Sequence, residues 1–258
     1  PGTTESPTSK GRQSHLEGPP VPPRGAASPT SARGDGRLTP MGEARSSISL
    51  DEAVELTRSG DIWLFRGGTG ADRAIQLATN APVNHVALAV VIDDLPPMMW
   101  HAELGRGLID LWTGTHHRGA QLHDLRASAL RWMGARHQRA WLRQLQPETG
   151  RVEDDALMRS IARWNGTSFP STAQLAWRWL SGRSEVPVPG RGERSRAEQA
   201  EAAYCAELAG VTLEAMGVVE AGDKPINWYD PGTFWSGDRL PVTPGWAYGG
   251  EIEVVVDP

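Results

Sequence analysis

The sequence predicts an α+β domain in which an antiparallel sheet packs against helices. Short apolar runs, rich in β-branched and aromatic residues and separated by turns containing Gly and Pro, are typical of strands. Longer segments with apolar residues at helical spacing follow these runs in the second half of the chain. Strands gathered ahead of helices favour an α+β architecture over one with regular strand–helix alternation.

The length and composition are consistent with one sizeable domain that carries a tail. The chain has 258 residues, of which 39% are hydrophobic. Residues 1–45 are rich in Pro, Ser, Gly and Thr and nearly lack large apolar residues, so we expect a disordered tail. Residues 46–258 are expected to form the domain, with a flexible Pro/Gly/Arg loop near 181–196.

Charge and cysteine content exclude several classes of function. The net charge of -5, without a dense Lys/Arg stripe, argues against nucleic acid as a partner. No apolar run is long enough for a transmembrane segment, and no signal pattern precedes the domain. Cys205 is the only cysteine, which excludes an internal disulfide and a cysteine-rich zinc cluster. A lone thiol suits a reducing compartment, so we expect a cytoplasmic protein without a cofactor; the oligomeric state stays open.

Local signals define the elements of the first half. Ser49 and Glu52 fit a capping box, so a helix is expected to begin at Leu50. The sequence APVNHVALAVVI has the apolar character of a buried strand, with one histidine set into it. The expected elements are a helix over Leu50–Thr57, a strand over Asp61–Phe65, a helix over Ala71–Thr79 and a strand within Ala81–Ile92.

The second half is expected to begin with strands and continue with helices. Gly105–Gly107 marks a turn between two strands, and Gly217 marks the end of the longest helix. The expected strands are Met98–Ala102, Leu108–Trp112, Ala120–Leu122 and, last in the chain, Glu251–Val256. The expected helices are Ala135–Leu145, Glu153–Trp164, Thr172–Leu180 and Ala197–Met216.

Three residues form a candidate catalytic set: Cys205, His85 and His101. A cysteine reacts as the thiolate, and a neighbouring imidazolium or a helix N-terminus lowers its pKa. The imidazole that accepts the proton needs its second nitrogen held by another polar group. His85 and His101 lie on successive predicted strands, so antiparallel pairing would bring the two rings side by side.

Local motifs resemble those of a known family of thiol enzymes. Gly60–Gly67, GDIWLFRG, resembles the opening "GDILLFRG" strand of the circularly permuted papain-like (NlpC-type) proteins. These proteins include the YiiX/YaeF-like amidases and the lecithin:retinol acyltransferase-like group. Pro82–Leu88, PVNHVAL, looks like their "SPxSHVGL" segment, and Trp100–Ala102, WHA, looks like the strand that follows. Ala203–Leu208, AYCAEL, resembles their "FFCSEL" motif.

The resemblance implies a permuted papain-like fold and a role for each candidate residue. Cys205 falls on the nucleophile, His85 on the base and His101 on the residue that orients the base. Tyr204 and Asn84, beside the nucleophile and the base, are the expected substrate-binding residues. The family's cysteine lies in the first turn of its helix, which would start the helix near Tyr204. The chain departs from the pattern at Asn84, Ala87 and Ala206, where the family usually has serine, glycine and serine. His101 stands where the amidase-like members have glutamate and the acyltransferase-like members have histidine, and Glu103 competes with it for the orienting role.

Several functional alternatives remain open from the sequence. The expected enzyme is a cysteine-dependent hydrolase or acyl-transfer enzyme that acts on a peptide, a cell-wall peptide or the acyl ester of a lipid. A non-catalytic binding module on the same fold is the alternative, because the motifs depart from the family. A metal site through His85, His101, His116 and His117 is a third hypothesis, although His116 and His117 are expected to lie in a solvated loop. The 11 tryptophans line an acyl groove or, as we favour, fill the core.

Overall fold

The computed structural model describes residues 47–67, 82–135, 138–167, 193–220, 222, 229–236 and 240–256, with the side chains of the long helix α6 described from Tyr204 onward. The expected tail over 1–45 and the expected helices Ala71–Thr79 and Thr172–Leu180 lie outside these residues. So does most of the predicted loop near 181–196, whose last four residues belong to α6.

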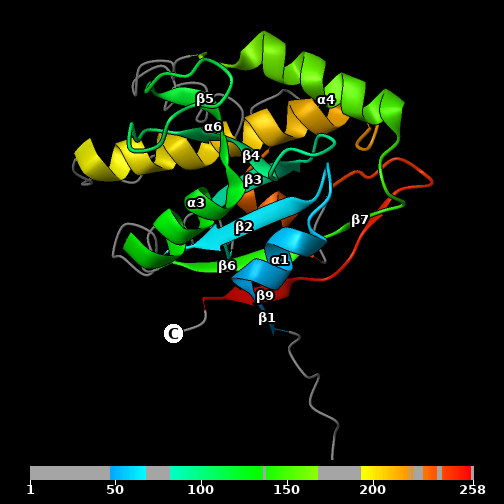
Figure 1. Ribbon diagram of the computed structural model, residues 1–258, viewed down its shortest axis with the longest axis horizontal. Helices are drawn as coiled ribbons and strands as arrows, with labels where there is room; N and C mark the ends of the chain where they lie inside the picture. The colour runs from blue at the N-terminus through cyan, green and yellow to red at the C-terminus, as the bar shows by residue number, and fades with distance from the viewer. Residues whose placement is uncertain are drawn as a thin grey trace, which may run out of the picture. The chain divides into compact units, whose positions relative to one another are not determined.

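The fold is α+β, as predicted, and is built on a seven-stranded sheet. The strands in spatial order are β1 (Ser47–Ser49), β9 (Ile252–Val255), β6 (Arg139–Arg143), β2 (Ile62–Arg66), β3 (His85–Val90), β4 (Met98–Glu103) and β5 (Gly119–Asp124). Every neighbouring pair is antiparallel except β1 and β9, which are parallel (Figure 1). The sheet is therefore mixed, which corrects the expectation of a purely antiparallel one.

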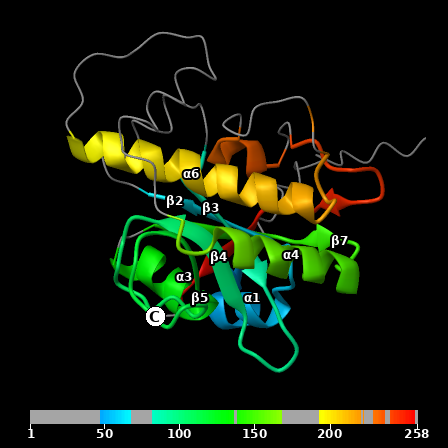
Figure 2. The ribbon, with the colours of Figure 1, turned by 90° about the horizontal axis from the view of Figure 1, so that it is seen from above.

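Helices cover both faces of the sheet in the described part of the chain. The α-helices are α1 (Leu50–Leu56), α3 (Leu125–Leu130), α4 (Arg151–Trp164) and α6 (Glu193–Ala215). Figure 2 shows α6 on one side of the strands and α1 and α3 on the other. A π-helical turn η1 (Arg131–Ala135) continues α3, a 3₁₀ turn η3 (Pro231–Phe234) precedes the C-terminal segment, and β7 (Leu145–Gln146) pairs with β8 (Ala247–Tyr248).

Side-chain alternation along the strands creates two separate apolar cores. Successive residues of a strand point to opposite faces. Val86, Leu88 and Val90 of β3 therefore join the first core, with the buried residues of α4 and α6. Ala87 and Ala89 join the second core, with residues of α1, α3 and η1. Which core a strand residue enters follows from its place in this alternation, and the same rule places the polar residues.

Several predicted elements are confirmed, together with the local reasons for them. Ser49 caps α1, since its Oγ accepts a hydrogen bond from Glu52 N–H at 3.1 Å. The last helix ends at Ala215, and Gly217 follows with a φ of 74°, a conformation that glycine adopts without strain. The predicted strands Asp61–Phe65, Met98–Ala102 and Glu251–Val256 correspond to β2, β4 and β9.

The strand predicted over Leu108–Trp112 is wrong. The Asp110 carboxylate accepts hydrogen bonds from Thr113 N–H and Leu122 N–H, which holds the segment in a turn. Ile109, Leu111 and Trp112 are each nearly half exposed, as expected of a loop that covers part of the sheet.

The helix predicted over Ala135–Leu145 is also wrong, because its described residues from Arg139 onward form β6 and the start of β7. Its apolar residues suit a helix face and a doubly buried strand equally well. The segment forms a strand because β6 pairs with both β2 and β9, where Leu142 is paired with Trp63 and Ile252. Both partners lie far away in sequence, so no local pattern reveals them.

The outer edge of β5 is covered by loops of the same chain. Leu111 N–H donates to Leu122 O at 2.7 Å, and Gly166 N–H donates to Ala120 O at 3.0 Å. Ala120 N–H donates in turn to Thr167 O at 3.2 Å. Backbone groups at this edge are thus used within the domain.

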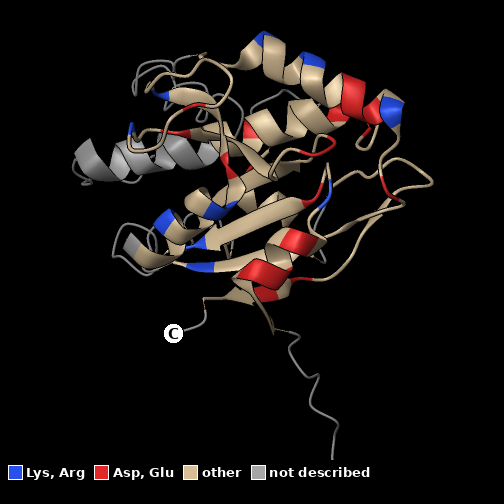
Figure 3. Cartoon of the chain, viewed as in Figure 1, with Lys and Arg blue, Asp and Glu red and all other residues tan. Residues whose placement is uncertain are grey.

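Charged residues of both signs are distributed over the described elements. Figure 3 shows acidic residues on α1 and basic residues on α3. One pair joins the two helices, with Arg126 Nη2 2.6 Å from Asp51 Oδ1. The helices that the structure describes include none with the length and hydropathy required to cross a bilayer.

We predict that Gly210→Ala destabilises the domain, because a Cβ at position 210 of α6 would overlap the buried ring of Tyr229. Overpacking typically costs about 1–3 kcal/mol, and the better helix propensity of Ala returns at most about 1 kcal/mol. The free energy of unfolding measured by urea denaturation should fall by about 1–2 kcal/mol. Gly134→Ala is the matched control, since a Cβ there meets no atom within 4 Å. Equal stabilities of the two variants would contradict the prediction.

Candidate functional site

Three histidines from neighbouring strands form a continuous buried chain on the second-core face of the sheet. His85 Nε2 lies 3.0 Å from His101 Nδ1, and His101 Nε2 lies 2.9 Å from His123 Nδ1. The strands β3, β4 and β5 supply one ring each, and each ring is at most 1% exposed. The sequence thus folds so that the predicted base and its predicted orienting residue are within hydrogen-bond distance.

The chain of rings ends at Gln121, whose amide orientation is fixed by its own hydrogen bonds. Gln121 Nε2 donates to Glu103 O at 3.2 Å and to Gly119 O at 3.4 Å. Gln121 Oε1 therefore faces His123 Nε2, 3.1 Å away. An amide oxygen only accepts hydrogen bonds, so His123 Nε2 carries the proton in this contact.

Aromatic and charged side chains surround the histidines. The ring of Trp132 stacks on His85, with the centroids 3.9 Å apart and the planes at 22°. Glu103 is fully buried on β4, and its Oε1 lies 3.5 Å from Arg131 Nε. Glu103 is thus near Arg131, while the ring nitrogen of His85 is near His101.

Burial keeps His123 neutral over the ordinary pH range. Desolvation disfavours the imidazolium, and the neighbouring His101 adds to that effect, so the pKa of His123 falls to about 3 from its ordinary value of 6.5. Glu103 and Asp110 act in the opposite direction and are outweighed. A neutral His123 has one donor and one acceptor nitrogen, as the hydrogen-bond chain requires.

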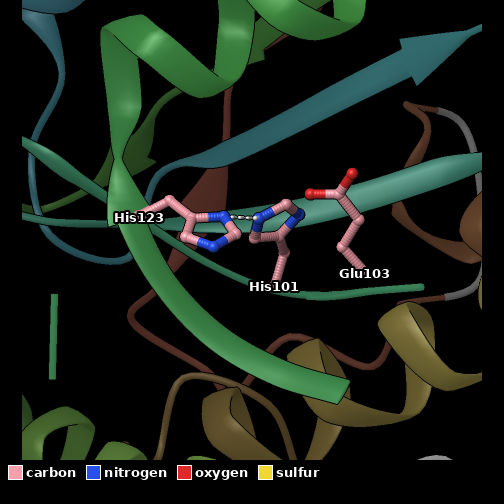
Figure 4. Close-up of side chains that lie close together, drawn as sticks. All are labelled: His101, Glu103 and His123. Carbon is pink, nitrogen blue, oxygen red and sulfur yellow. Dashed lines mark hydrogen bonds between the residues drawn. The ribbon is translucent and has the colours of Figure 1, made fainter. Parts of the chain in front are cut away.

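His101, Glu103 and His123 are also the described residues that come nearest to a metal-ligand set. One ligand atom of each lies within 4.8 Å of the others, and Figure 4 shows the two rings side by side with the carboxylate of Glu103 next to His101. Two imidazole nitrogens bound to one tetrahedral Zn²⁺ would be roughly 3.3 Å apart. The observed 2.9 Å is a hydrogen-bond distance, so the rings as described are bonded to each other.

Cys205 lies on α6, the helix that packs against β3 and β4. Trp100 Nε1–H donates to Thr212 Oγ1 at 3.2 Å, which fixes the helix against β4. Cys205 precedes Thr212 by two helical turns, about 10 Å, the length of about three strand residues. The β3–β4 register pairs Leu88 with Trp100, and three residues further along it reaches the level of His85. Cys205 is thus separated from Thr212 by about the distance that separates Leu88 from His85 along β3.

The same residue packs in the first core, whereas the ring of His85 stacks within the second. Cys205 is 1% exposed and belongs to the cluster with Val86 and Leu88. His85, one residue before Val86, contacts Trp132 of the other cluster. The thiol and the imidazole thus approach the end of β3 from opposite faces of the sheet.

The helical environment of Cys205 also differs from the family expectation. The helix α6 begins at Glu193, twelve residues before Cys205, and not near Tyr204. A helix interior does not supply the N-terminal dipole that lowers a thiol pKa. The backbone N–H of an interior helical residue donates to the carbonyl four residues earlier. The N–H of Cys205 is therefore not available to stabilise the negative oxygen that forms when a thiolate attacks a carbonyl.

The two residues expected to bind substrate are mostly buried and hydrogen-bonded within the chain. Asn84 Oδ1 accepts from Gly67 N–H at 2.8 Å, and Tyr204 O–H donates to Thr167 O at 3.3 Å. Each is 8% exposed. Their contacts position the start of β3 and the middle of α6, at the same end of the sheet as His85.

The adjacent histidines of the β4–β5 loop lie apart from the histidine chain. His116 Nδ1 lies 2.9 Å from Leu108 O, and His117 Nε2 lies 3.2 Å from Asp110 Oδ2. Burial alone would raise the pKa of Asp110, but hydrogen bonds, led by that of Thr113, lower it to about 2. The structure therefore gives His117 an acidic partner that the sequence did not indicate. The four-histidine metal set is not assembled among the described residues.

Sequence reasoning missed His123, Gln121 and Trp132. His123 and Gln121 share a face of β5, two residues apart, but the predicted strand stopped at Leu122. Trp132 lies in the π-helical turn, in a segment for which no element was predicted. Alternation along Gly119–Asp124 indicates that His123 and Gln121 share a face of the strand. Only the register with β4 shows that this face is the one that carries His101.

Comparisons with known proteins leave the family of the chain open. No protein-family model matches it, and no curated protein does. Among solved structures, the chain is similar to the crystal structure of metalloprotein yiiX from Escherichia coli O157:H7, DUF1105. The TM-score is 0.42 and the identity 14%, over 76% of this chain and 97% of that chain. A match at this level carries no argument about fold or function.

We predict a pH-dependent stability that depends on His123. Because the unfolded chain binds a proton near pH 6.5 and the folded His123 near pH 3, the free energy of unfolding should fall as pH drops through this window. In His123→Gln the slope should be smaller by about 1.4 kcal/mol per pH unit, measured by urea denaturation between pH 4 and 6. His116→Gln, at an exposed histidine, should keep the wild-type slope.

Asp61 does not disturb this comparison. Burial raises its pKa to about 6, so it titrates in the same window, but it does so in every variant. Identical slopes for the wild type and His123→Gln would show that His123 is not held neutral.

Proposed function

We propose that this domain is a cysteine-dependent hydrolase or acyl-transfer enzyme on a circularly permuted papain-like fold. His85 is its general base, His101 orients His85, and Cys205 is the nucleophile. The observation that carries the proposal is the 3.0 Å contact between His85 Nε2 and His101 Nδ1.

His101 supports the role of His85 by fixing its ring. A base must present one particular nitrogen, and because Nε2 contacts His101, Nδ1 is the nitrogen assigned to proton transfer in this proposal. Stacking on Trp132 further restricts rotation of the ring. Glu103, the rival for the orienting role, has its Oε1 3.5 Å from Arg131 Nε, which supports His101 for this role.

The reaction requires the sulfur and His85 Nδ1 to meet at the end of β3. The S–H proton passes to Nδ1, and the thiolate attacks the substrate carbonyl carbon to form a C–S bond. The imidazolium returns the proton to the departing amine or alcohol as the C–N or C–O bond breaks. Water, or an acceptor amine, then attacks the thioester, releases the acyl group as an acid or amide, and restores the thiol.

Two substrate classes fit this chemistry. One is an amide bond in a peptide or cell-wall peptide, and the other is the acyl ester of a lipid. The orienting residue is a histidine here, as in the acyltransferase-like group that the motifs resemble, which supports the ester. Incubation with a short peptide amide and with a short-chain acyl glycerol, followed by mass analysis of the Cys205 peptide, distinguishes the two.

A non-catalytic binding module is the second candidate, and the position of Cys205 supports it. The residue lies in the interior of α6 and packs in the first core, while His85 belongs to the opposite face. In a binding module the histidine chain has a purely structural role. The measurements of thiol reactivity below separate the two candidates.

We predict that Cys205 reacts with iodoacetamide with an apparent pKa below 8.5, the ordinary value of a free thiol. An imidazole that accepts the proton stabilises the thiolate, so the apparent pKa in His85→Ala should rise by at least one unit. The alkylation rate of Cys205 is measured from pH 5 to 10 by mass spectrometry of the intact protein, which contains one cysteine.

The matched control for this experiment is His116→Ala, which removes an exposed histidine of the loop. Its pH profile should coincide with that of the wild type. An apparent pKa at or above the free-thiol value that is the same in His85→Ala would refute the catalytic proposal and leave the binding module.

A further inference from the structure

The hydrogen-bond chain through the three histidines has a direction, and Gln121 determines it. The amide nitrogen of Gln121 is committed to Glu103 O and Gly119 O, so its oxygen is the atom presented to His123. An oxygen acceptor at this end requires a proton on His123 Nε2. The neutral ring of His123 then has its lone pair on Nδ1.

The same logic passes along the chain, one ring at a time. His123 Nδ1 is an acceptor, so the contact of 2.9 Å requires that His101 Nε2 donates to it. A neutral His101 then has its lone pair on Nδ1, and the contact of 3.0 Å requires that His85 Nε2 donates to that atom. The lone pair of His85 is therefore on Nδ1, the nitrogen that a base at this position must use.

The argument holds for neutral rings, and the burial of the chain favours that state over the opposing effect of Glu103 and Asp110 on His123. Each ring is at most 1% exposed, and burial disfavours an imidazolium. Among the described residues, the charged groups near the rings are Glu103, Arg131 and Asp110, and His117 lies beyond Asp110. Arg131 is available to balance the charge of Glu103, so no imidazolium is needed as its counterion.

We propose that Gln121 and His123 are positioning residues that fix the tautomer of His85, with its lone pair on Nδ1. The inference rests on the proposed function for its catalytic meaning, but the tautomer is a property of the folded chain. Neither residue touches the reacting atoms. Their effect is transmitted through His101, at a distance of two strands from His85.

Nitrogen-15 NMR of the folded wild-type protein, labelled at histidine, tests the tautomer directly. Protonated and unprotonated ring nitrogens have well-separated shifts, and long-range couplings assign Nδ1 and Nε2. At pH 7.5 we expect an unprotonated Nδ1 and a protonated Nε2 in each of His85, His101 and His123. A protonated Nδ1 on neutral His85, or an imidazolium at any of the three positions, overturns the proposal without any variant.

Gln121→Met tests the origin of the direction. Methionine fills a similar volume without the amide, so His123 loses the partner that selects its tautomer. One buried hydrogen bond favours a tautomer by roughly fivefold to a hundredfold, and in the variant the ratio for His85 should approach one. His116→Gln assigns one exposed resonance and should leave the ratio unchanged. A folded Gln121→Met with the wild-type ratio overturns the assignment to Gln121.

His123→Gln and His123→Phe form a second pair. The glutamine amide can accept from His101 and donate to Gln121, so the His85 tautomer should be retained. The phenyl ring does neither, so the tautomer should become mixed. Wild-type tautomers in both variants would remove His123 from the mechanism. Thiol reactivity that is insensitive to His85, together with the expected tautomers, would refute the proposed enzyme and leave this inference intact.

Discussion

Backbone pairing between β3, β4 and β5 determines what the second core contains, because it brings one histidine from each strand onto the same face. The three rings lie on a diagonal: His101 is paired with Gln121, and His123 is paired with Met99. A shift of either register by a single residue would move a ring to the opposite face, among Val86, Leu88 and Trp100. No imidazole partner would meet it there. Pairing energy in this part of the sheet is therefore coupled to the polar contacts of the site.

A polar chain inside an apolar layer is stable only when it is complete. Each of His85, His101 and His123 satisfies its neighbour, and Gln121 closes the chain with an amide that is itself bound to two carbonyls. Loss of one member leaves a buried nitrogen without its partner, which costs more than the bond itself contributes. The four residues are thus expected to behave as one unit in stability measurements, with strongly non-additive effects of substitution.

The sequence predicted those features that depend on nearby residues. The cap at Ser49, the apolar strands around Trp63 and Val86, and the stop at Gly217 are all local signals, and each element was placed correctly. The strand β6 was missed because its identity depends on β2 and β9, which lie far away in the chain. His123 was missed for the same reason. The face on which Cys205 packs depends on how α6 docks, which no spacing of residues along the helix determines.

The covered edge of β5 has a consequence for assembly. An exposed edge strand offers its N–H and C=O groups to a strand of another molecule. In this domain the groups of Ala120 and Leu122 are occupied by the segments around Leu111 and Gly166. Two copies therefore cannot join their sheets through these positions without first displacing their own loops. The β5 edge of the sheet, whose strand carries His123, is thereby protected from the edge-to-edge strand pairing that leads to fibrils.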